Sequence, residues 1–191
     1  MDNNYIFQYW EAIQNGTVTV GKWIRTIYKI LVDGLKSGKW DYDEGKAEKA
    51  IKFIENFCHH SEGRNDLLKL ELWQKAIVSA IFGIMDKKTG YRQFREVFIV
   101  VARKNGKTLF AAAIAAYMTY IDGEYGAKVY FLAPKLDQAE LVYDAFYQIV
   151  QADDELASIT KKRRSDIYIK EFNTSVKKIA FNSKKSDGFN P

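Results

Sequence analysis

The hydrophobic and polar positions divide this chain into two parts with different periodicities. From about residue 5 to residue 60, apolar side chains recur at helical spacing, and the pattern breaks at Asn15-Gly16 and Ser37-Gly38. A further helix is expected from about Glu71 to Met85. The helix between these two breaks is expected to bury one face. That face consists of Trp23, Ile27, Ile30, Leu31, Gly34 and Leu35.

After residue 96 the pattern changes to short apolar runs that alternate with amphipathic segments. Residues 97–102 are continuously apolar, which is typical of a strand covered on both faces of a parallel sheet. A helix over 107–120, an apolar strand over 128–133 and a helix over about 136–151 follow. This order predicts an α/β fold with a mostly parallel sheet flanked by helices, preceded by a helical N-terminal part.

The last forty residues combine positive charge with alternating apolar positions. Residues 166–172 and 176–181 flank Asn173-Thr174-Ser175, which predicts a hairpin. A basic stretch at 161–164 and the pair Lys184-Lys185 have two interpretations. They are either solvated loop residues or contacts to the backbone of DNA.

The polar turn after the apolar run 97–102 is the strongest candidate for chemistry. It reads Arg103-Lys104-Asn105-Gly106-Lys107-Thr108 and leads directly into a helix, as in a phosphate-binding loop. In such a loop Lys107 reaches the β- and γ-phosphates, and the hydroxyl of Thr108 binds Mg²⁺. The usual first glycine is replaced by Val101, and an ordinary capped turn between a strand and a helix is the alternative interpretation.

Composition limits the classes of protein that fit. The chain has 191 residues, 47% of them hydrophobic, which is sufficient for a packed core. A net charge of +5 suits an anionic partner without requiring one. The single cysteine, Cys58, excludes an internal disulfide and fits a reducing compartment, and next to His59 and His60 it suits helix-end packing better than a metal site. Without a signal peptide or a membrane-spanning stretch, we expect a soluble, cytoplasmic protein.

The turn and its surroundings resemble a known family. Residues 101–108 resemble the deviant phosphate loop of the large terminase subunits, the DNA-packaging motors of tailed bacteriophages. In that family an arginine precedes the loop lysine by four positions, as Arg103 precedes Lys107. Leu70-Glu71-Leu72-Trp73-Gln74 resembles the adenine-recognising segment. Further similar segments are 21–23, 40–43, 53–58, 133–135, 137–139 and 186–191.

The resemblance implies a nucleotide site made of several of these residues. Gln74 pairs with the edge of adenine, and Arg103, Asn105, Gly106, Lys107 and Thr108 bind the phosphates of ATP, with Mg²⁺ at Thr108. Lys107 and Arg103 are the expected catalytic residues, with Arg103 at the γ-phosphate as a charge-stabilising or sensing group. A surface helix residue and a solvated turn arginine are the alternative interpretations of Gln74 and Arg103. Lys104 is expected to be a solvated neighbour.

The resemblance also implies the organisation of the chain. Residues 1–66 correspond to a helical N-terminal subdomain, and residues 67–191 to part of a P-loop ATPase core whose sheet is incomplete. The acidic strand that holds Mg²⁺ is expected after residue 191, and so is the nuclease domain, so the fragment is expected to hydrolyse ATP poorly or not at all. The implied partners are double-stranded DNA, the small terminase subunit, the portal protein and further copies of the chain.

Two other classes of function remain open from the sequence. The chain could be part of another P-loop translocase or helicase, which shares the loop and the strand order. It could also be a non-hydrolysing module that binds DNA or protein and carries a degenerate loop. The second class predicts no nucleotide affinity and no effect of changing Lys107.

Overall fold

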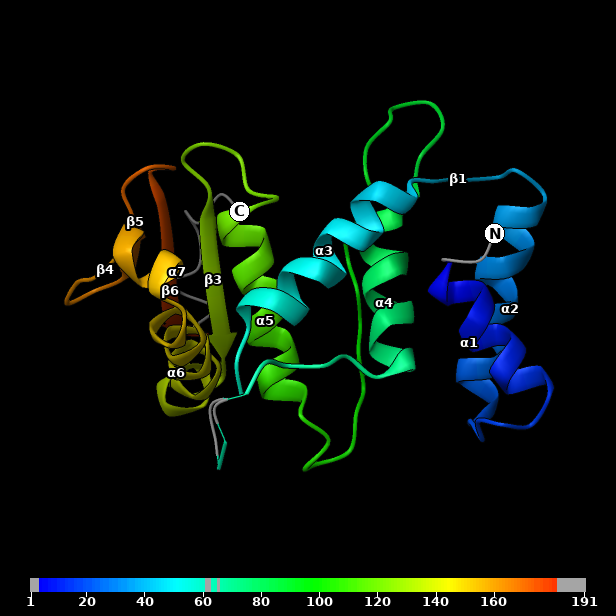
Figure 1. Cartoon of the computed structure of the whole chain (residues 1–191), viewed down its shortest axis with the longest axis horizontal. Coiled ribbons are helices and arrows are strands. Elements are labelled where there is room, and N and C mark those ends of the chain that lie inside the picture. Colours follow the sequence, from blue (N-terminus) through cyan, green and yellow to red (C-terminus); the bar gives the residue numbers. More distant parts are fainter. Residues whose placement is uncertain (1–3, 61–62, 65, 182–191) are drawn as a thin grey trace. The chain divides into compact units, whose positions relative to one another are not determined.

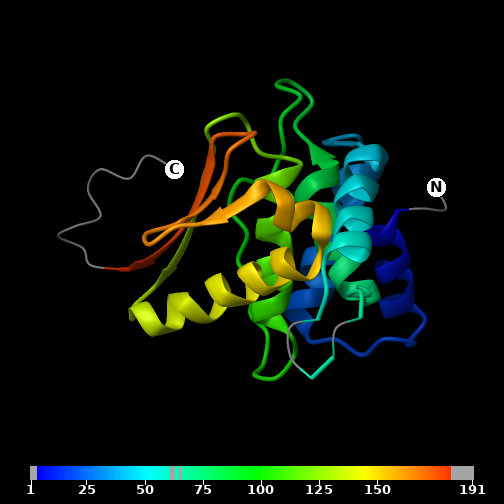
Figure 2. The same ribbon diagram turned by 60° about the vertical axis from the view of Figure 1, so that its left-hand side comes forward.

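The computed structural model describes residues 4–60, 63–64 and 66–181. The chain divides into two compact units, each made of two segments (Figures 1 and 2). Unit 1 comprises Met1–Phe53 and Lys69–Val100, and unit 2 comprises Ile54–Leu68 and Val101–Pro191. The division at residue 66 expected from the sequence stays a prediction. Lys184-Lys185 and the motif at 186–191 lie outside the described residues.

Unit 1 is mainly helical. The helix α1 packs against α2 and against α4, and a two-stranded antiparallel sheet pairs Asp41 with Met85 and Tyr42 with Ile84. The rings of Tyr9 and Tyr28 meet edge to face, with their centroids 4.7 Å apart. The elements of this unit are α1 (Tyr5–Gln14), α2 (Lys22–Lys36), β1 (Asp41–Tyr42), the first part of α3 (Glu44–Phe57), α4 (Leu72–Gly83) and β2 (Ile84–Met85).

The predicted helix breaks in this unit are confirmed. The carboxamide of Asn4 accepts a hydrogen bond from the Ile6 N–H at 3.0 Å and so starts α1, which ends at Gln14. The second predicted break lies between the end of α2 and the start of α3. The helix expected over about 71–85 is α4, slightly shorter because its last two residues form β2.

The predicted buried face of α2 is only partly correct. Leu31 and Gly34 are buried, but Trp23 is 72% exposed, Ile27 43% and Ile30 49%. The buried face is turned toward Tyr28 and Val32 instead. The reason is a close approach at Gly34, where an added Cβ would lie 2.4 Å from Cζ3 of the Trp40 ring. Only a glycine admits that ring, so this side of the helix faces the core.

Unit 2 carries a four-stranded mixed sheet in the order β3-β6-β5-β4. The first pair is parallel and the other two pairs are antiparallel. The helix α6 packs on β3 and β6, and α5 packs on α6 (Figure 1). The elements are α5 (Lys107–Tyr120), β3 (Lys128–Ala133), α6 (Leu136–Ala152), α7 (Asp154–Ile159), β4 (Thr160–Lys162), β5 (Ile167–Ile169) and β6 (Thr174–Ala180).

The core of unit 2 lies between α6, α5 and the sheet. Phe146 is fully buried and stacks on Tyr120 at 6.4 Å between centroids, while Phe131 from β3 lies 6.0 Å from it. The predicted elements 107–120 and 128–133 and the C-terminal hairpin are confirmed. The α/β class is therefore confirmed, and one of the three strand pairings in the sheet of unit 2 is parallel.

The predicted strand over residues 97–102 is absent. The segment forms no strand pairing among the described residues, and Phe98 is 92% and Val100 79% exposed. An apolar run becomes a buried strand only where neighbouring strands accept its backbone hydrogen bonds and helices cover its faces. No described segment supplies such a neighbour, so the run is exposed. The turn that follows it is continuous with α5 and not with a strand.

None of the helices in the described part of the chain has the length and apolar character needed to cross a lipid bilayer.

Candidate functional site

The loop that leads into α5 has an unusual backbone. Lys104 has φ of 66° and Gly106 has φ of 67°, both in the left-handed region. The side-chain amide of Asn105 donates to the carbonyls of Ala102, at 3.3 Å, and Arg103, at 3.2 Å, and so holds the turn together. A non-glycine residue in this region carries strain, which accumulates at ligand-binding loops.

The start of α5 presents free donors to an open space. Its first intrahelical hydrogen bond runs from the Phe110 N–H to the carbonyl of Gly106 at 2.9 Å, and no side chain caps the helix. The preceding N–H groups, at Lys107, Thr108 and Leu109, therefore have no acceptor within the helix. A Cβ built on Gly106 would meet no atom within 4 Å. The positive end of the helix and its donors thus face a volume that an anion can occupy.

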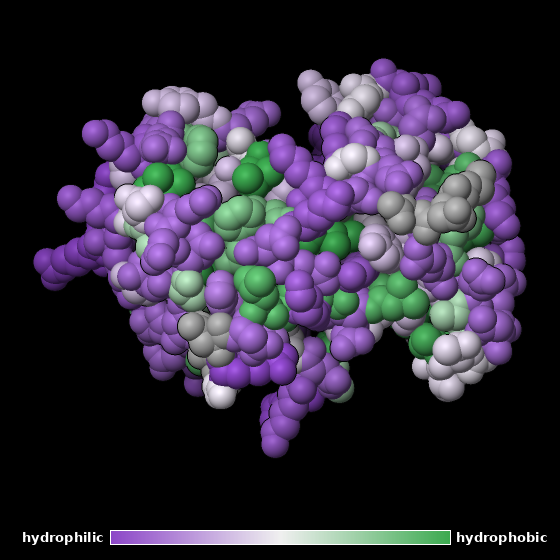
Figure 3. Space-filling model, viewed as in Figure 1, coloured by the Kyte–Doolittle hydropathy of each residue, from purple (hydrophilic) through white to green (hydrophobic). Residues whose placement is uncertain are grey.

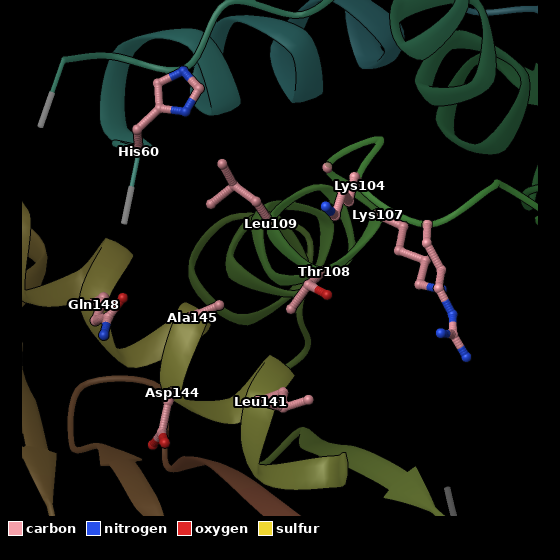
Figure 4. Close-up of a pocket in the computed structure, with 11 residues that line it drawn as sticks. His60, Lys104, Lys107, Thr108, Leu109, Leu141, Asp144, Ala145 and Gln148 are labelled. Carbon is pink, nitrogen blue, oxygen red and sulfur yellow. The ribbon is translucent and has the colours of Figure 1, made fainter. Parts of the chain in front are cut away.

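This space is a pocket of about 640 Å³. The loop and the first turn of α5 form one side, and the facing side chains of α6 form the other (Figure 4). Three of the lining residues are cations, and Asp144 is the acidic one. The lining residues are His60, Arg103, Lys104, Gly106, Lys107, Thr108, Leu109, Leu141, Asp144, Ala145 and Gln148.

The structure brings together most of the site residues that the sequence predicts. Arg103, Gly106, Lys107 and Thr108 all line the pocket, while Asn105 supports the loop from within. Lys104, expected to be a solvated neighbour, also lines the pocket, although its side chain is exposed. An excess of positive charge at a helix N-terminus favours a polyanionic ligand.

Three polar lining residues were not predicted from the sequence. Asp144 and Gln148 lie one helical turn apart on α6, and His60 follows α3. They reach the pocket because α6 packs on α5 and because the segment after α3 belongs to the same compact unit. No spacing rule in the sequence connects these positions with the loop.

Gln74 lies in unit 1, in the first turn of α4. Its side-chain oxygen accepts a hydrogen bond from the Glu71 N–H at 2.9 Å, and the residue is 8% exposed. Together with the Glu71 side chain it forms a reciprocal cap at the start of the helix. Trp73 packs partly buried against the apolar cluster of unit 1.

The three consecutive residues Cys58, His59 and His60 have different surroundings. Cys58 is fully buried, and burial, together with the nearby charge of Asp153, raises the pKa of its thiol to about 12. His59 pairs with Leu67 in an isolated bridge, and His60 lines the pocket. In the described part of the chain, no three His, Cys, Asp or Glu side chains are grouped so that they could hold a metal ion.

Comparison with known proteins agrees with this geometry. The family model described as "Terminase large subunit, ATPase domain" matches residues 72–191. The crystal structure of the HK97 bacteriophage large terminase is similar, with a TM-score of 0.65 and 25% sequence identity. The similar region covers 76% of this chain and 29% of that terminase, so the chain spans less than a third of its length. A search of curated proteins found no match. Because the family match extends over more than half of the chain and includes the whole loop, the chain belongs to the terminase large subunit family, through its ATPase domain.

Proposed function

We propose that unit 2 binds the phosphates of ATP with Mg²⁺, as the nucleotide-binding part of a motor that packages double-stranded DNA. The observation that carries this proposal is the uncapped N-terminus of α5, which opens with Lys107 and Thr108 onto a cationic pocket. The family match supports it, because that family's domain is an ATPase.

In this proposal the loop binds the triphosphate through its backbone and two side chains. The N–H groups of the first turn of α5 donate to phosphate oxygens, and Gly106 leaves room for their close approach. Lys107 places its ammonium at the β- and γ-phosphates, and Thr108 contributes a hydroxyl oxygen to Mg²⁺. Asn105 keeps the loop in shape through its two hydrogen bonds to backbone carbonyls.

Arg103 is proposed to contact the γ-phosphate. It lines the same pocket as Lys107 and is exposed, so its guanidinium is available to a ligand. Two cations at the γ-phosphate stabilise the charge that spreads over its oxygens during hydrolysis, without covalent chemistry by the protein.

Gln74 is proposed to recognise adenine. An amide can accept from and donate to the exocyclic edge of that base at the same time. The Gln74 oxygen already accepts from Glu71, but a carbonyl oxygen has a second lone pair, and the side-chain nitrogen has two hydrogens.

The remaining elements of the motor are proposed from the family. We infer that the ATPase domain forms a mostly parallel P-loop sheet, and that an acidic strand end completes the Mg²⁺ site. Residues 1–66 then form a helical subdomain before the ATPase core that starts at residue 67. The motor works in the host cytoplasm with several copies at the portal protein and with the small terminase subunit.

A titration with a fluorescent ATP analogue and Mg²⁺ tests the proposal. Wild-type chain is compared with Lys107→Ala and with Lys170→Ala, which removes an exposed lysine of the same unit outside the pocket. Loss of a charged hydrogen bond weakens binding about tenfold to a hundredfold, so Lys107→Ala should do so while Lys170→Ala has no effect. Equal affinity of all three proteins, or no binding by a folded wild-type chain, favours the non-hydrolysing module instead.

Arg103 has its own test. If it contacts the γ-phosphate, Arg103→Ala should weaken binding of the ATP analogue and leave the affinity for ADP unchanged. Equal losses for both nucleotides would place Arg103 elsewhere on the ligand. Arg103→Lys retains the charge without the planar fork and should give an intermediate result.

A further inference from the structure

Four consecutive cations, residues 161–164, lie where β4 turns into β5; we call them the basic hairpin tip. β4 is an edge strand of the sheet of unit 2, and the Arg163 N–H donates to the carbonyl of Asp166 at 2.8 Å, which closes the turn. All four side chains are exposed. The two ribbon views show this hairpin projecting from unit 2, and Figure 3 shows hydrophilic side chains gathered over the same edge.

Aromatic rings position two of these cations. Nζ of Lys162 lies 4.1 Å from the centroid of the Tyr147 ring of α6, and Cζ of Arg163 lies 3.5 Å from the centroid of the Tyr168 ring of β5. A ring face attracts a cation without neutralising its charge, so both groups are held in place and stay available to an anion.

The charge of the tip is not compensated by ion pairs. Within the described residues, none of the four cations forms a salt bridge, and Asp166 is the single acidic residue between Thr160 and Ile169. Its carboxylate is buried, at 7% exposure of the residue. An excess of three positive charges is therefore concentrated on one short hairpin.

Protection of the sheet edge explains only part of this charge. Lysines on an edge strand discourage pairing with another chain, and Lys161 and Lys162 are placed for that purpose. Arg163 and Arg164 lie beyond the strand, in a turn where glycine, asparagine, aspartate or serine is usual. The turn therefore does not require arginines, and their presence indicates an anionic partner.

We propose that the basic hairpin tip contacts the phosphate backbone of double-stranded DNA, independently of base sequence. This inference rests on the proposed function, which makes duplex DNA the substrate. Four residues span at most on the order of 10 Å, and a duplex presents one phosphate charge per ~1.7 Å of its axis, so phosphates are available to all four cations within that length. The arginines match phosphate oxygens in bidentate fashion, and contacts to phosphates carry no sequence information directly.

Salt-dependent binding of a short random-sequence duplex, followed by fluorescence anisotropy, tests the inference. The variant carries Lys161→Gln, Lys162→Gln, Arg163→Gln and Arg164→Gln. Because each phosphate contact contributes about 0.9 to the slope of log K against log salt concentration, the slope should fall by about three to four. The control carries Lys22→Gln, Arg25→Gln, Lys36→Gln and Lys39→Gln, which removes the same charge from unit 1, and should keep most of the wild-type slope.

Each other outcome overturns the inference. An unchanged slope, an equal loss in the control, or no duplex binding by folded wild-type chain would exclude the tip as the DNA contact. An equally strong loss of binding to polyglutamate would assign it to acidic proteins instead. Where the fourfold variant fails to fold, Arg163→Gln with Arg164→Gln, both outside the strand, should lower the slope by about two. Titration of the same proteins with the ATP analogue reports the nucleotide site separately, so failure of the proposed function is seen independently.

Discussion

The side-chain oxygen of Gln74 accepts a hydrogen bond from the backbone N–H of Glu71 at 2.9 Å, and the Glu71 side chain accepts one from the backbone N–H of Gln74 at the start of α4. The same amide that is proposed to recognise adenine therefore also starts a helix of unit 1. The two roles share the oxygen but differ at the nitrogen, because the cap needs only an acceptor and the base needs a donor as well. Substitutions at position 74 can separate them.

Gln74→Glu should keep the helix cap, at some cost in stability because the new carboxylate is buried beside Glu71, and should lose the preference of the chain for ATP over GTP. A carboxylate still accepts from the Glu71 N–H and suits the positive end of α4, but it has no hydrogen to donate to the base. Gln74→Ala should lose both functions, with a cost of about 0.5–2 kcal/mol in the free energy of unfolding. Urea unfolding and competitive nucleotide titration measure the two effects. ATP binding at wild-type strength by the Glu variant would remove Gln74 from the nucleotide site.

The two left-handed residues of the loop should respond in opposite directions. Gly106→Ala places a Cβ at φ of 67° and should cost about 1–2 kcal/mol of stability, although open space surrounds the position. Lys104→Gly relieves the strain at φ of 66° and should leave stability unchanged or higher. Thermal unfolding of both variants checks this. A Gly106→Ala chain as stable as wild type would contradict the loop geometry.

The elements that could be predicted from the sequence are those with local causes. The helix α5 begins after a polar turn and ends shortly before Gly123, and the strand β3 lies between Gly126 and Pro134. The loop residues of the site were found for the same reason, because Lys107 and Thr108 are adjacent in the sequence. His60, Asp144 and Gln148 enter the pocket through packing between elements, which no local pattern records.

The two wrong predictions have non-local causes. In α2, the stripe of Trp23, Ile27 and Ile30 has the same period as the buried stripe beside it, and the close approach of Trp40 to Gly34 decides between them. In residues 97–102, a strand requires partners that no described segment provides. Periodicity identifies an apolar stripe, but what covers that stripe depends on the rest of the fold.

Exposure of the 97–102 segment gives a direct mutational test. Phe98→Ser should change the free energy of unfolding by less than about 0.5 kcal/mol, because the ring is 92% exposed. Phe110→Ala, at a phenylalanine 3% exposed in α5, should cost about 3–5 kcal/mol. Both values come from urea unfolding. Comparable large losses would mean that Phe98 is buried, as a strand in a covered sheet requires.

Alkaline pH should destabilise the chain, beginning near pH 9. Burial raises the pKa of the Cys58 thiol from 9.0 to about 12, and burial likewise raises the pKa of Tyr42 from 10.0 to about 12. Between pH 9 and pH 12 the folded state keeps these protons and the unfolded state loses them. The contribution of the two groups to the free energy of unfolding is therefore fully present below pH 9 and is lost as the pH rises toward 12.

Cys58→Ala isolates the thiol. Between the ordinary pKa of a thiol and that of a tyrosine, Cys58 loses its proton in the unfolded state but keeps it in the folded state. This difference lowers the free energy of unfolding by up to about 1.4 kcal/mol per pH unit. The variant should therefore lose less stability than wild type between pH 8 and pH 10, measured by urea unfolding at each pH. Parallel losses in the two proteins would show that the thiol is accessible.

The contact between Gly34 and Trp40 should reverse the usual effect of a glycine substitution in a helix. Replacing an interior helical glycine with alanine normally stabilises by about 1 kcal/mol. At Gly34 the new methyl would lie 2.4 Å from the Trp40 ring, which itself packs edge to face on Phe94, so Gly34→Ala should cost about 1–3 kcal/mol instead. Gly45→Ala, in the first turn of α3 with its nearest contact at 3.4 Å, is the matched control and should stabilise the chain. Urea unfolding followed by tryptophan fluorescence reports both changes, and stabilisation by both variants would mean that the Trp40 ring does not occupy the face of α2 beside Gly34.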